Sequence, residues 1–348
     1  MSFEKIIILY CLFKMNGERT VYSILHLLNG KKSSQTIQDI HIFQLTPLFQ
    51  LYPTLTRERL NGLVFELNQE NWLTELNKDH YKVRENRMTE LQELWIEKPF
   101  PRELQGWKFH QDTNLFWAKL TLMVQVCAHL AESKTQYIPV QRNPYVQQWV
   151  KKAIVSLPIE KSEINSYLYK ELVSIFIDSP IDPLLIISRF TGINKIGLTA
   201  NQLVEELKLD PFYYQVQFVA LLHYMMDKMK ANQEAYPIVS CMLESNQNGY
   251  TLTASTNKTL DYVKKGFSIE QIVERRSLKR STIEDHFIEI LLNIPEFTPE
   301  HFVSSEKIKK IKACIESSSS KSLKIIKEQL EEVSYFEIRV VLARYGDL

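Results

Sequence analysis

The chain has 348 residues, 45% hydrophobic and 24% charged, which is the balance of a soluble globular protein of about two or three domains. Only nine residues are glycine and the net charge is +1, which argues against glycine-rich phosphate loops and a uniformly basic surface. Four well-separated cysteines form no C-x-x-C pair, which argues against a zinc ribbon or a disulfide framework and indicates reduced cytoplasmic thiols.

Residues 1–97 predict a winged-helix-like N-terminal domain. The apolar run Ile6–Phe13 is too short to span a bilayer and lacks the features of a signal peptide, so we expect a buried first helix in a cytoplasmic protein. Helical periodicity over 33–45 and again over 56–72 precedes two β-prone runs around Asn77–His80. The order helix, helix, hairpin is typical of a winged-helix core.

Residues Asn29–Ser33 only superficially resemble a phosphate-binding P-loop. His26 stands where a P-loop has its first glycine, and Lys32 stands in the place of its Ser/Thr. Lys31 and Lys32 are better interpreted as a basic helix end or as part of a DNA-facing surface.

The sequence contains no H-E-x-x-H or G-x-S-x-G motif and no carboxylate pair marked as an acid/base site. We therefore expect a protein that is not an enzyme, with no catalytic residue, no cofactor and no metal site.

Residues 98–192, beginning beside Pro99 and Pro101, predict a helical middle region without a repeat or a chemical motif. Cys127 and His129 lie two residues apart, so their side chains diverge on a helix, and we expect core packing rather than a metal site.

Residues 193–254 predict a second helix–helix–hairpin segment. Two helical stretches are followed by β-prone runs on either side of Asn248–Gly249, a strong turn dipeptide. The methionines of the second helix, Met225, Met226 and Met229, are expected to fill the core.

Residues 255–348 predict a C-terminal helix–turn–helix domain. Gly266 is placed to end one helix, and Ser268 with Gln271 forms a capping box for the next. Phe267 and Ile272 form the accompanying hydrophobic staple.

The second helix of the motif is predicted to start near Lys279 or Ser281, with a capping box formed by Ser281 and Glu284. Its buried stripe consists of Ile283, Phe287, Ile290 and Leu291. The stripe leaves Arg280, Ser281, Glu284 and Asp285 on or near solvent, and His286 is interpreted as a surface residue.

A third capping box, Ser334 with Glu337, opens the terminal helix, with Val333 and Ile338 as its staple. Gly346 is placed to close this helix.

Local charge indicates contact with phosphates. From Lys264 to Thr282 six basic residues face two acidic ones, a local +4, and from Glu306 to Lys327 seven lysines face two glutamates, a local +5. Glu284 and Asp285 disfavour reading of bases in a groove, so the pattern favours the DNA backbone, although solvated helix faces explain the lysines nearly as well. The candidate DNA-binding residues are Lys264, Lys265, Arg275, Arg276, Lys279, Arg280, Ser281, Lys309, Lys310 and Lys312.

The motif and the segment LKIIKEQLEEVSYFEIRVVLARYG after it are similar to the helix–turn–helix domain at the C-terminus of some RecQ-type helicases. The N-terminal stretch RTVYSILHLLNGKKSSQTIQDIHIFQL resembles the YpbB-like proteins of Gram-positive bacteria, which carry that domain at their own C-terminus. The resemblance implies a non-enzymatic partner of a RecQ-type helicase in DNA repair or recombination, and it supplies no assigned site residue.

Three hypotheses follow, with a mainly α, multi-domain fold common to all. The first is a cytoplasmic accessory protein that binds duplex or single-stranded DNA largely without sequence preference, beside a RecQ-type helicase and away from membranes. The second is a scaffold that docks the helicase, or a single-strand-binding protein, without touching DNA. The third is a transcription regulator with a preferred operator.

Overall fold

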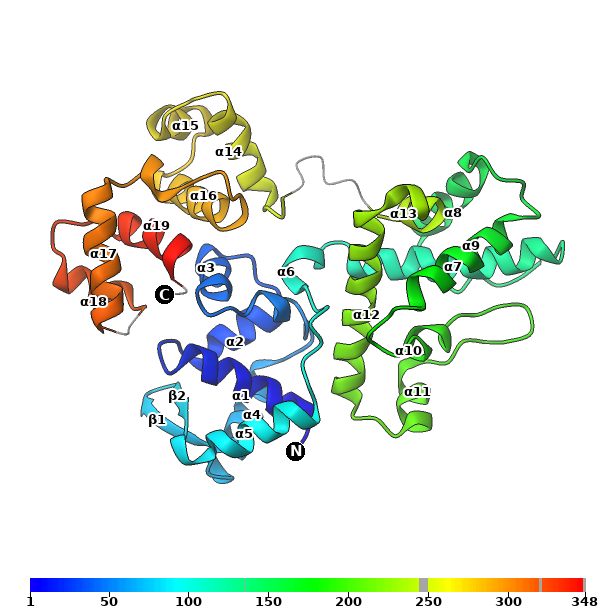
Figure 1. The fold of residues 1–348 in the computed structure, drawn as a ribbon, viewed down its shortest axis with the longest axis horizontal. Helices are drawn as coiled ribbons and strands as arrows, with labels where there is room; N and C mark the ends of the chain where they lie inside the picture. Colours follow the sequence, from blue (N-terminus) through cyan, green and yellow to red (C-terminus); the bar gives the residue numbers. More distant parts are fainter. Residues whose placement is uncertain (135, 244–249, 319–320, 347–348) are drawn as a thin grey trace. The chain divides into compact units, whose positions relative to one another are not determined.

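The computed structural model describes residues 1–134, 136–243, 250–318 and 321–346 of the chain. Over these ranges the protein is mainly helical with one two-stranded sheet, which confirms the mainly α fold class (Figure 1). The chain forms two compact units: Met1–Ile6 with Leu91–Ser245, and Ile7–Glu90 with Asn246–Leu348. We call them the first and the second unit.

The two units group the four predicted segments in pairs. Most of 1–97 and all of 255–348 belong to the second unit, whereas most of 98–254 belongs to the first. The winged-helix-like and helix–turn–helix segments, which are distant in the sequence, therefore share one compact unit.

The N-terminal elements have the predicted order of helix, helix and hairpin. They are α1 (Phe3–Met15), α2 (Val21–Leu28), α3 (Ser34–Ile42), η1 (Thr46–Leu48), α4 (Arg57–Gln69), β1 (Leu73–Asn77), β2 (His80–Val83), η2 (Glu85–Arg87) and α5 (Met88–Glu97). Ser33 caps α3 and Thr56 caps α4, each by accepting a hydrogen bond from a backbone N–H of the first turn. The strands pair antiparallel, with Leu73 opposite Val83, and most of the apolar side chains of the predicted first helix are buried.

The first unit is built from helices. They are α6 (Gly106–Phe109), α7 (Thr113–Ala131), α8 (Pro144–Ser156), α9 (Ile164–Phe176), α10 (Leu184–Ile187), α11 (Ala200–Leu207), α12 (Pro211–Ala231), η3 (Gln233–Ala235) and α13 (Pro237–Ser240). As predicted, Cys127 and His129 of α7 are buried, and so are Met225, Met226 and Met229 of α12.

The strands predicted on either side of Asn248–Gly249 do not form in the described residues, and the turn dipeptide itself lies outside them. The first β-prone run instead contains α13, and residues 250–253 are not in a strand. Pro237 suits the first position of a helix, where its missing N–H leaves no bond unmade. Glu171 accepts hydrogen bonds from two backbone N–H groups in the first turn of α13, so a tertiary contact favours the helix over the local β-propensity.

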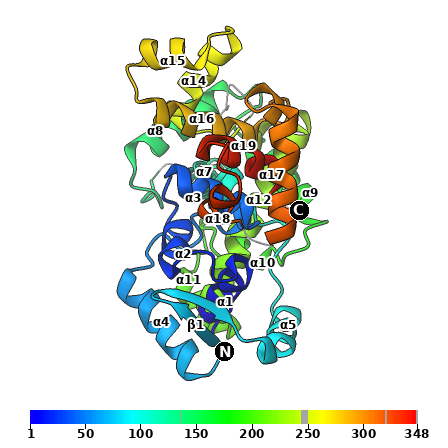
Figure 2. The same ribbon diagram turned by 90° about the vertical axis from the view of Figure 1, so that its left-hand side faces the viewer.

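Helices also build the C-terminal part of the second unit. They are α14 (Ala254–Lys264), α15 (Ile269–Arg276), α16 (Arg280–Asn293), η4 (Pro299–His301), α17 (Ser305–Ser318), α18 (Leu323–Gln329) and α19 (Tyr335–Tyr345). Helix α16 packs against α14, α15 and α19 and also against α3 from the N-terminal part. Figures 1 and 2 both show α3 beside α16 and α19.

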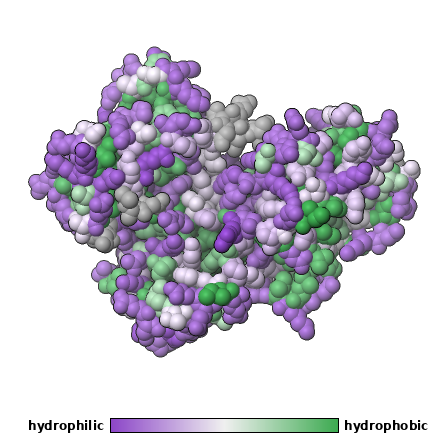
Figure 3. All heavy atoms as spheres, viewed as in Figure 1, coloured by the Kyte–Doolittle hydropathy of each residue, from purple (hydrophilic) through white to green (hydrophobic). Residues whose placement is uncertain are grey.

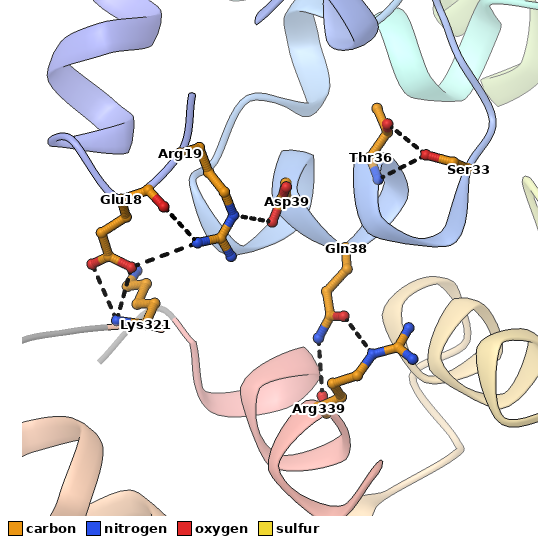
Figure 4. Close-up of polar contacts among 8 residues, drawn as sticks. All are labelled: Glu18, Arg19, Ser33, Thr36, Gln38, Asp39, Lys321 and Arg339. Atoms are coloured by element: carbon orange, nitrogen blue, oxygen red, sulfur yellow. Dashed lines mark hydrogen bonds and ion pairs between the residues drawn. The ribbon is translucent and has the colours of Figure 1, made fainter. Parts of the chain in front are cut away.

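Polar contacts join the N-terminal and C-terminal parts of the second unit (Figure 4). The side-chain amide of Gln38 on α3 accepts a hydrogen bond from Nε of Arg339 on α19 at 2.8 Å. The carboxylate of Glu18 accepts from the backbone N–H of Lys321 at 3.0 and 3.1 Å. These bonds add to the packing of α3 against α16.

The surface is mixed in character. On the face drawn in Figure 3, hydrophilic residues predominate and apolar residues gather in separate patches. Across the described part of the chain, no helix has both the length and the apolar composition needed to cross a membrane.

Candidate nucleic-acid interface

The helix–turn–helix consists of α15, the three residues 277–279 and α16. Gly266 has φ of +79° and ends the preceding helix α14, because glycine adopts the left-handed conformation without a Cβ clash. Ser268 and Gln271 form the predicted capping box at the start of α15. Ser277, with φ of +49°, ends α15 and turns the chain toward α16.

An apolar cluster fixes α15 against α16. Ile272, Ile283 and Phe287 form its buried core, and Phe267 packs against them, which confirms the predicted staple. The predicted stripe of α16 is buried along its length, including Ile290 and Leu291. Burial of each such side chain is worth about 1.5–3 kcal/mol, so the geometry of the turn is firmly held.

The first turn of α16 differs from the sequence prediction. The helix starts at Arg280 with Lys279 as N-cap, so the capping box of Ser281 with Glu284 is wrong. The preceding residue, Leu278, packs against the apolar cluster, and the chain enters the helix directly after it. A lysine side chain has no acceptor atom, and no side chain caps this end of α16. Its first N–H groups are therefore left without a side-chain cap.

Arg280 is paired with acidic residues on both helices of the motif. Its Nη1 lies 2.9 Å from Oε1 of Glu270 on α15, and its Nε lies 3.0 Å from Oε1 of Glu284 on α16. The pKa of Glu270 is lowered by the backbone N–H of the same residue and by Arg280. Both ion pairs are exposed, and the two carboxylates offset the charge of Arg280. Arg280 therefore adds less to the positive potential at this surface than its position in the sequence suggested.

Arg276 has a structural role. Its guanidinium donates to the carbonyl oxygen of Ser255 at 3.0 Å and to Oγ1 of Thr259 at 2.6 Å, which ties α15 to α14. Arg275, by contrast, is exposed, with its guanidinium carbon 4.3 Å from the ring centroid of Phe267. The stacking positions the charge of Arg275 at the surface without neutralising it.

The remaining candidates of the motif, Lys264, Lys265, Lys279 and Ser281, are all exposed. Within the described ranges, no carboxylate lies at ion-pair distance from these three lysines or from Arg275. Four cations of the motif are therefore uncompensated, and they lie at the ends of α14 and α15 and in the turn. Arg280 differs from them because it is paired with carboxylates, and Arg276 because it is bonded to α14. We call Lys264, Lys265, Arg275 and Lys279 the turn cations.

The three lysines predicted to support this surface lie on α17, which packs against α18 and α19. Lys309 is exposed, whereas Lys310 pairs with Glu306 at 3.1 Å and Glu332 at 3.4 Å. The ammonium of Lys312 lies 4.0 Å from the ring centroid of Tyr345. Of these three, Lys309 has the most accessible charge.

The middle of α16 is engaged inside the second unit. Oδ1 of Asp285 accepts hydrogen bonds from Oγ of Ser34 at 2.8 Å and from Nη1 of Arg339 at 2.7 Å. Sequence reasoning placed Asp285 on or near solvent, as an anion repelling phosphate, and missed this role. Ser34 precedes it by 251 positions, and no local signal connects residues so far apart.

His286 is buried rather than on the surface of the helix, because α14 packs over it. Its Nδ1 lies 2.8 Å from Oγ1 of Thr259. Burial, followed by the charge of Arg276, lowers the pKa of His286 to about 4. His286 is therefore held in its neutral form inside the domain at neutral pH.

The combined geometry limits what α16 can do. From His286 to Leu291 every residue of α16 is buried, whereas Arg280 and Ser281 in its first turn are exposed. Reading bases requires a helix face that enters the major groove, and contact with phosphates requires only exposed donors and cations. The arrangement suits the second kind of contact.

Comparison with known proteins agrees with this architecture. The model of a family described as a helix-turn-helix domain matches residues 255–342. Protein YpbB of Bacillus subtilis (strain 168) is 33% identical over 348 residues, covering 99% of this chain and 98% of the relative. No solved structure matches the chain. A helix–turn–helix domain is typical of DNA-binding proteins.

Proposed function

The chain belongs to the YpbB family, and we propose that it is a non-enzymatic, DNA-binding accessory protein that acts beside a RecQ-type helicase in DNA repair or recombination. The observation that carries the proposal is the set of turn cations, which are exposed at the end of α14, in the last turn of α15 and at the N-cap of α16. The helicase is proposed as the partner because the C-terminal segment resembles the domain found at the C-terminus of some RecQ-type helicases.

Contact with DNA is proposed to run through the phosphate backbone. The turn cations supply charge, and the uncapped N–H groups at the start of α16 supply donors beside the positive end of the helix dipole. Ser281 adds a hydroxyl, Lys309 gives support from α17, and Arg280 contributes once a phosphate displaces one of its carboxylate partners. Released counterions drive such binding without regard to sequence.

This mode disfavours a transcription regulator. Operator recognition needs side chains that reach base edges from a reading helix. In α16 the residues from His286 to Leu291 are buried, and Arg280 at its start is paired with Glu270 and Glu284. We therefore expect little preference among DNA sequences.

The protein-docking scaffold remains the second candidate, and the pairing of Arg280 favours it. A surface whose arginine is already neutralised by Glu270 and Glu284 attracts DNA less strongly than the sequence count predicts. In that case the helix–turn–helix holds the helicase, and DNA retention does not depend on the turn cations.

Fluorescence anisotropy with unrelated duplexes and single strands tests the proposal. Four uncompensated phosphate contacts predict a slope of about −3.6 for log affinity against log salt on a duplex, a loss of roughly 150-fold between 50 and 200 mM salt. A strong preference for one duplex sequence would support the regulator. Absence of binding at low salt, together with co-purification of the helicase from native cells, would support the scaffold.

A further inference from the structure

A groove in the first unit has no assigned role and is independent of the helix–turn–helix. It encloses about 380 Å³ between α7 and α8, with Tyr137 and Pro139 at its edge. Leu122, Val126 and Leu130 of α7 follow one another at intervals of four residues, so they form a single stripe that lines the groove. Val150, Ile154 and Val155 line it from α8. Two helices thus turn apolar faces toward one open channel.

Part of this apolar lining is exposed to solvent. Val155 is 69% exposed, and Val126 and Leu130 are half-buried, although Leu122 and Val150 beneath them are buried. Single exposed apolar residues are common, but an apolar channel rimmed by charges is typical of an interaction site. A channel between two helices is suited to a third helix, which completes a helical layer by placing its own apolar stripe between the other two.

The charge around the groove points to the character of the occupant. Lys151 and Lys161 belong to its lining, and both are exposed; the described residues that line the groove include no carboxylate. Lys152, the next residue on α8, is also exposed. Cations beside an apolar channel complement a helix whose polar face is acidic.

We propose that the α7–α8 groove is a docking site for an acidic amphipathic helix of a partner protein. Its apolar side chains, spaced at i, i+3, i+4 and i+7, occupy the channel, and its carboxylates lie against Lys151 and Lys161. This inference does not rest on DNA contact by the turn cations, so either proposal can fail while the other stands.

The test uses the full chain and a fluorescein-labelled 16-residue helical peptide with leucines at the stated spacing and glutamates elsewhere. A matched peptide carries lysine in place of every glutamate, and another has the acidic composition in scrambled order. We expect the acidic peptide to bind at least tenfold more tightly than either control, with an affinity that falls as salt rises.

Two variants locate the site. Val155→Asp places a charge in the channel at an exposed position, and the double variant Lys151→Glu with Lys161→Glu reverses the charge at the rim of the groove. Each is expected to weaken binding of the acidic peptide about fivefold or more. Val173→Asp, at an exposed apolar position of α9, and Lys195→Glu are matched controls expected to bind as the parent chain does.

Equal binding of the acidic and basic peptides, or unchanged binding by both groove variants, would overturn the proposal. Circular dichroism of each variant separates loss of binding from loss of folding. Analytical sedimentation tests whether a second copy of the chain occupies the groove. A dimer that Val155→Asp abolishes would show that a second copy, and not an acidic partner, binds there.

Discussion

Replacing Asp285 by alanine is expected to loosen the contact between the N-terminal and C-terminal parts of the second unit. The substitution removes two hydrogen bonds to a carboxylate, one from Ser34 at 2.8 Å and one from Arg339 at 2.7 Å. A hydrogen bond to a charged group is worth about 1.5–3 kcal/mol, and the side chains of Asp285 and Arg339 are 36% and 18% exposed, so solvent screens part of this. Arg339 keeps Gln38 and Ser34 as partners. The expected loss is about 1–2 kcal/mol.

Native-state hydrogen exchange measures the effect where it occurs, which matters because a chain of two units need not unfold in one step. The amides of α3 and α16 are expected to open with a free energy lower by that amount in Asp285→Ala, and those of the first unit are expected to be unchanged. Glu284→Ala is the matched control, because it breaks only an exposed pair with Arg280 and costs less than about 1 kcal/mol. Equal effects of the two substitutions would refute the reasoning.

Two further predictions concern the helix–turn–helix alone. Ser268→Ala is expected to lower stability by about 1 kcal/mol because Ser268 caps α15. Ser281→Ala, one position inside α16, is expected to lower it by less than about 0.5 kcal/mol. Hydrogen exchange at the amides of α15 and α16 measures both losses, and equal losses would contradict the assigned caps. His286 has a folded pKa of about 4, below its ordinary value of 6.5, so its contribution to stability is complete above pH 6.5 and is lost as pH falls toward 4. The loss is on the order of 2 kcal/mol. Unfolding of the parent chain and of His286→Gln at pH 7 and 4.5 tests it, since the stability lost between these pH values should be smaller in the variant by about this amount, whereas buried His223 contributes equally to both.

Local features of the fold were predictable from the sequence because they depend on neighbouring residues. The capping box of Ser268 and Gln271, the left-handed Gly266 and the stripe of α16 each act within a few positions, and all three are confirmed. The same local logic failed at Ser281, because packing of Leu278 decides where α16 begins.

The candidate site was predictable only as a set of charges. Residues 250 or more positions apart meet at α16, so the bond between Ser34 and Asp285 had no signal in either segment. A charge count also cannot distinguish Lys279, which is exposed and uncompensated, from Arg276, which is bonded to α14. The hairpin predicted after α12 was lost for the same reason, because Glu171 holds the first turn of α13 from another helix.

The salt dependence of DNA binding by one variant tests the central claim most directly. Lys264→Gln, Arg275→Gln and Lys279→Gln in one chain remove three turn cations, all of them exposed, and Lys195→Gln is the control from the first unit. If these cations contact phosphates, the slope of log affinity against log salt becomes shallower by about 2.7 in the triple variant and stays unchanged in the control. An unaltered slope and affinity in the triple variant would contradict the account.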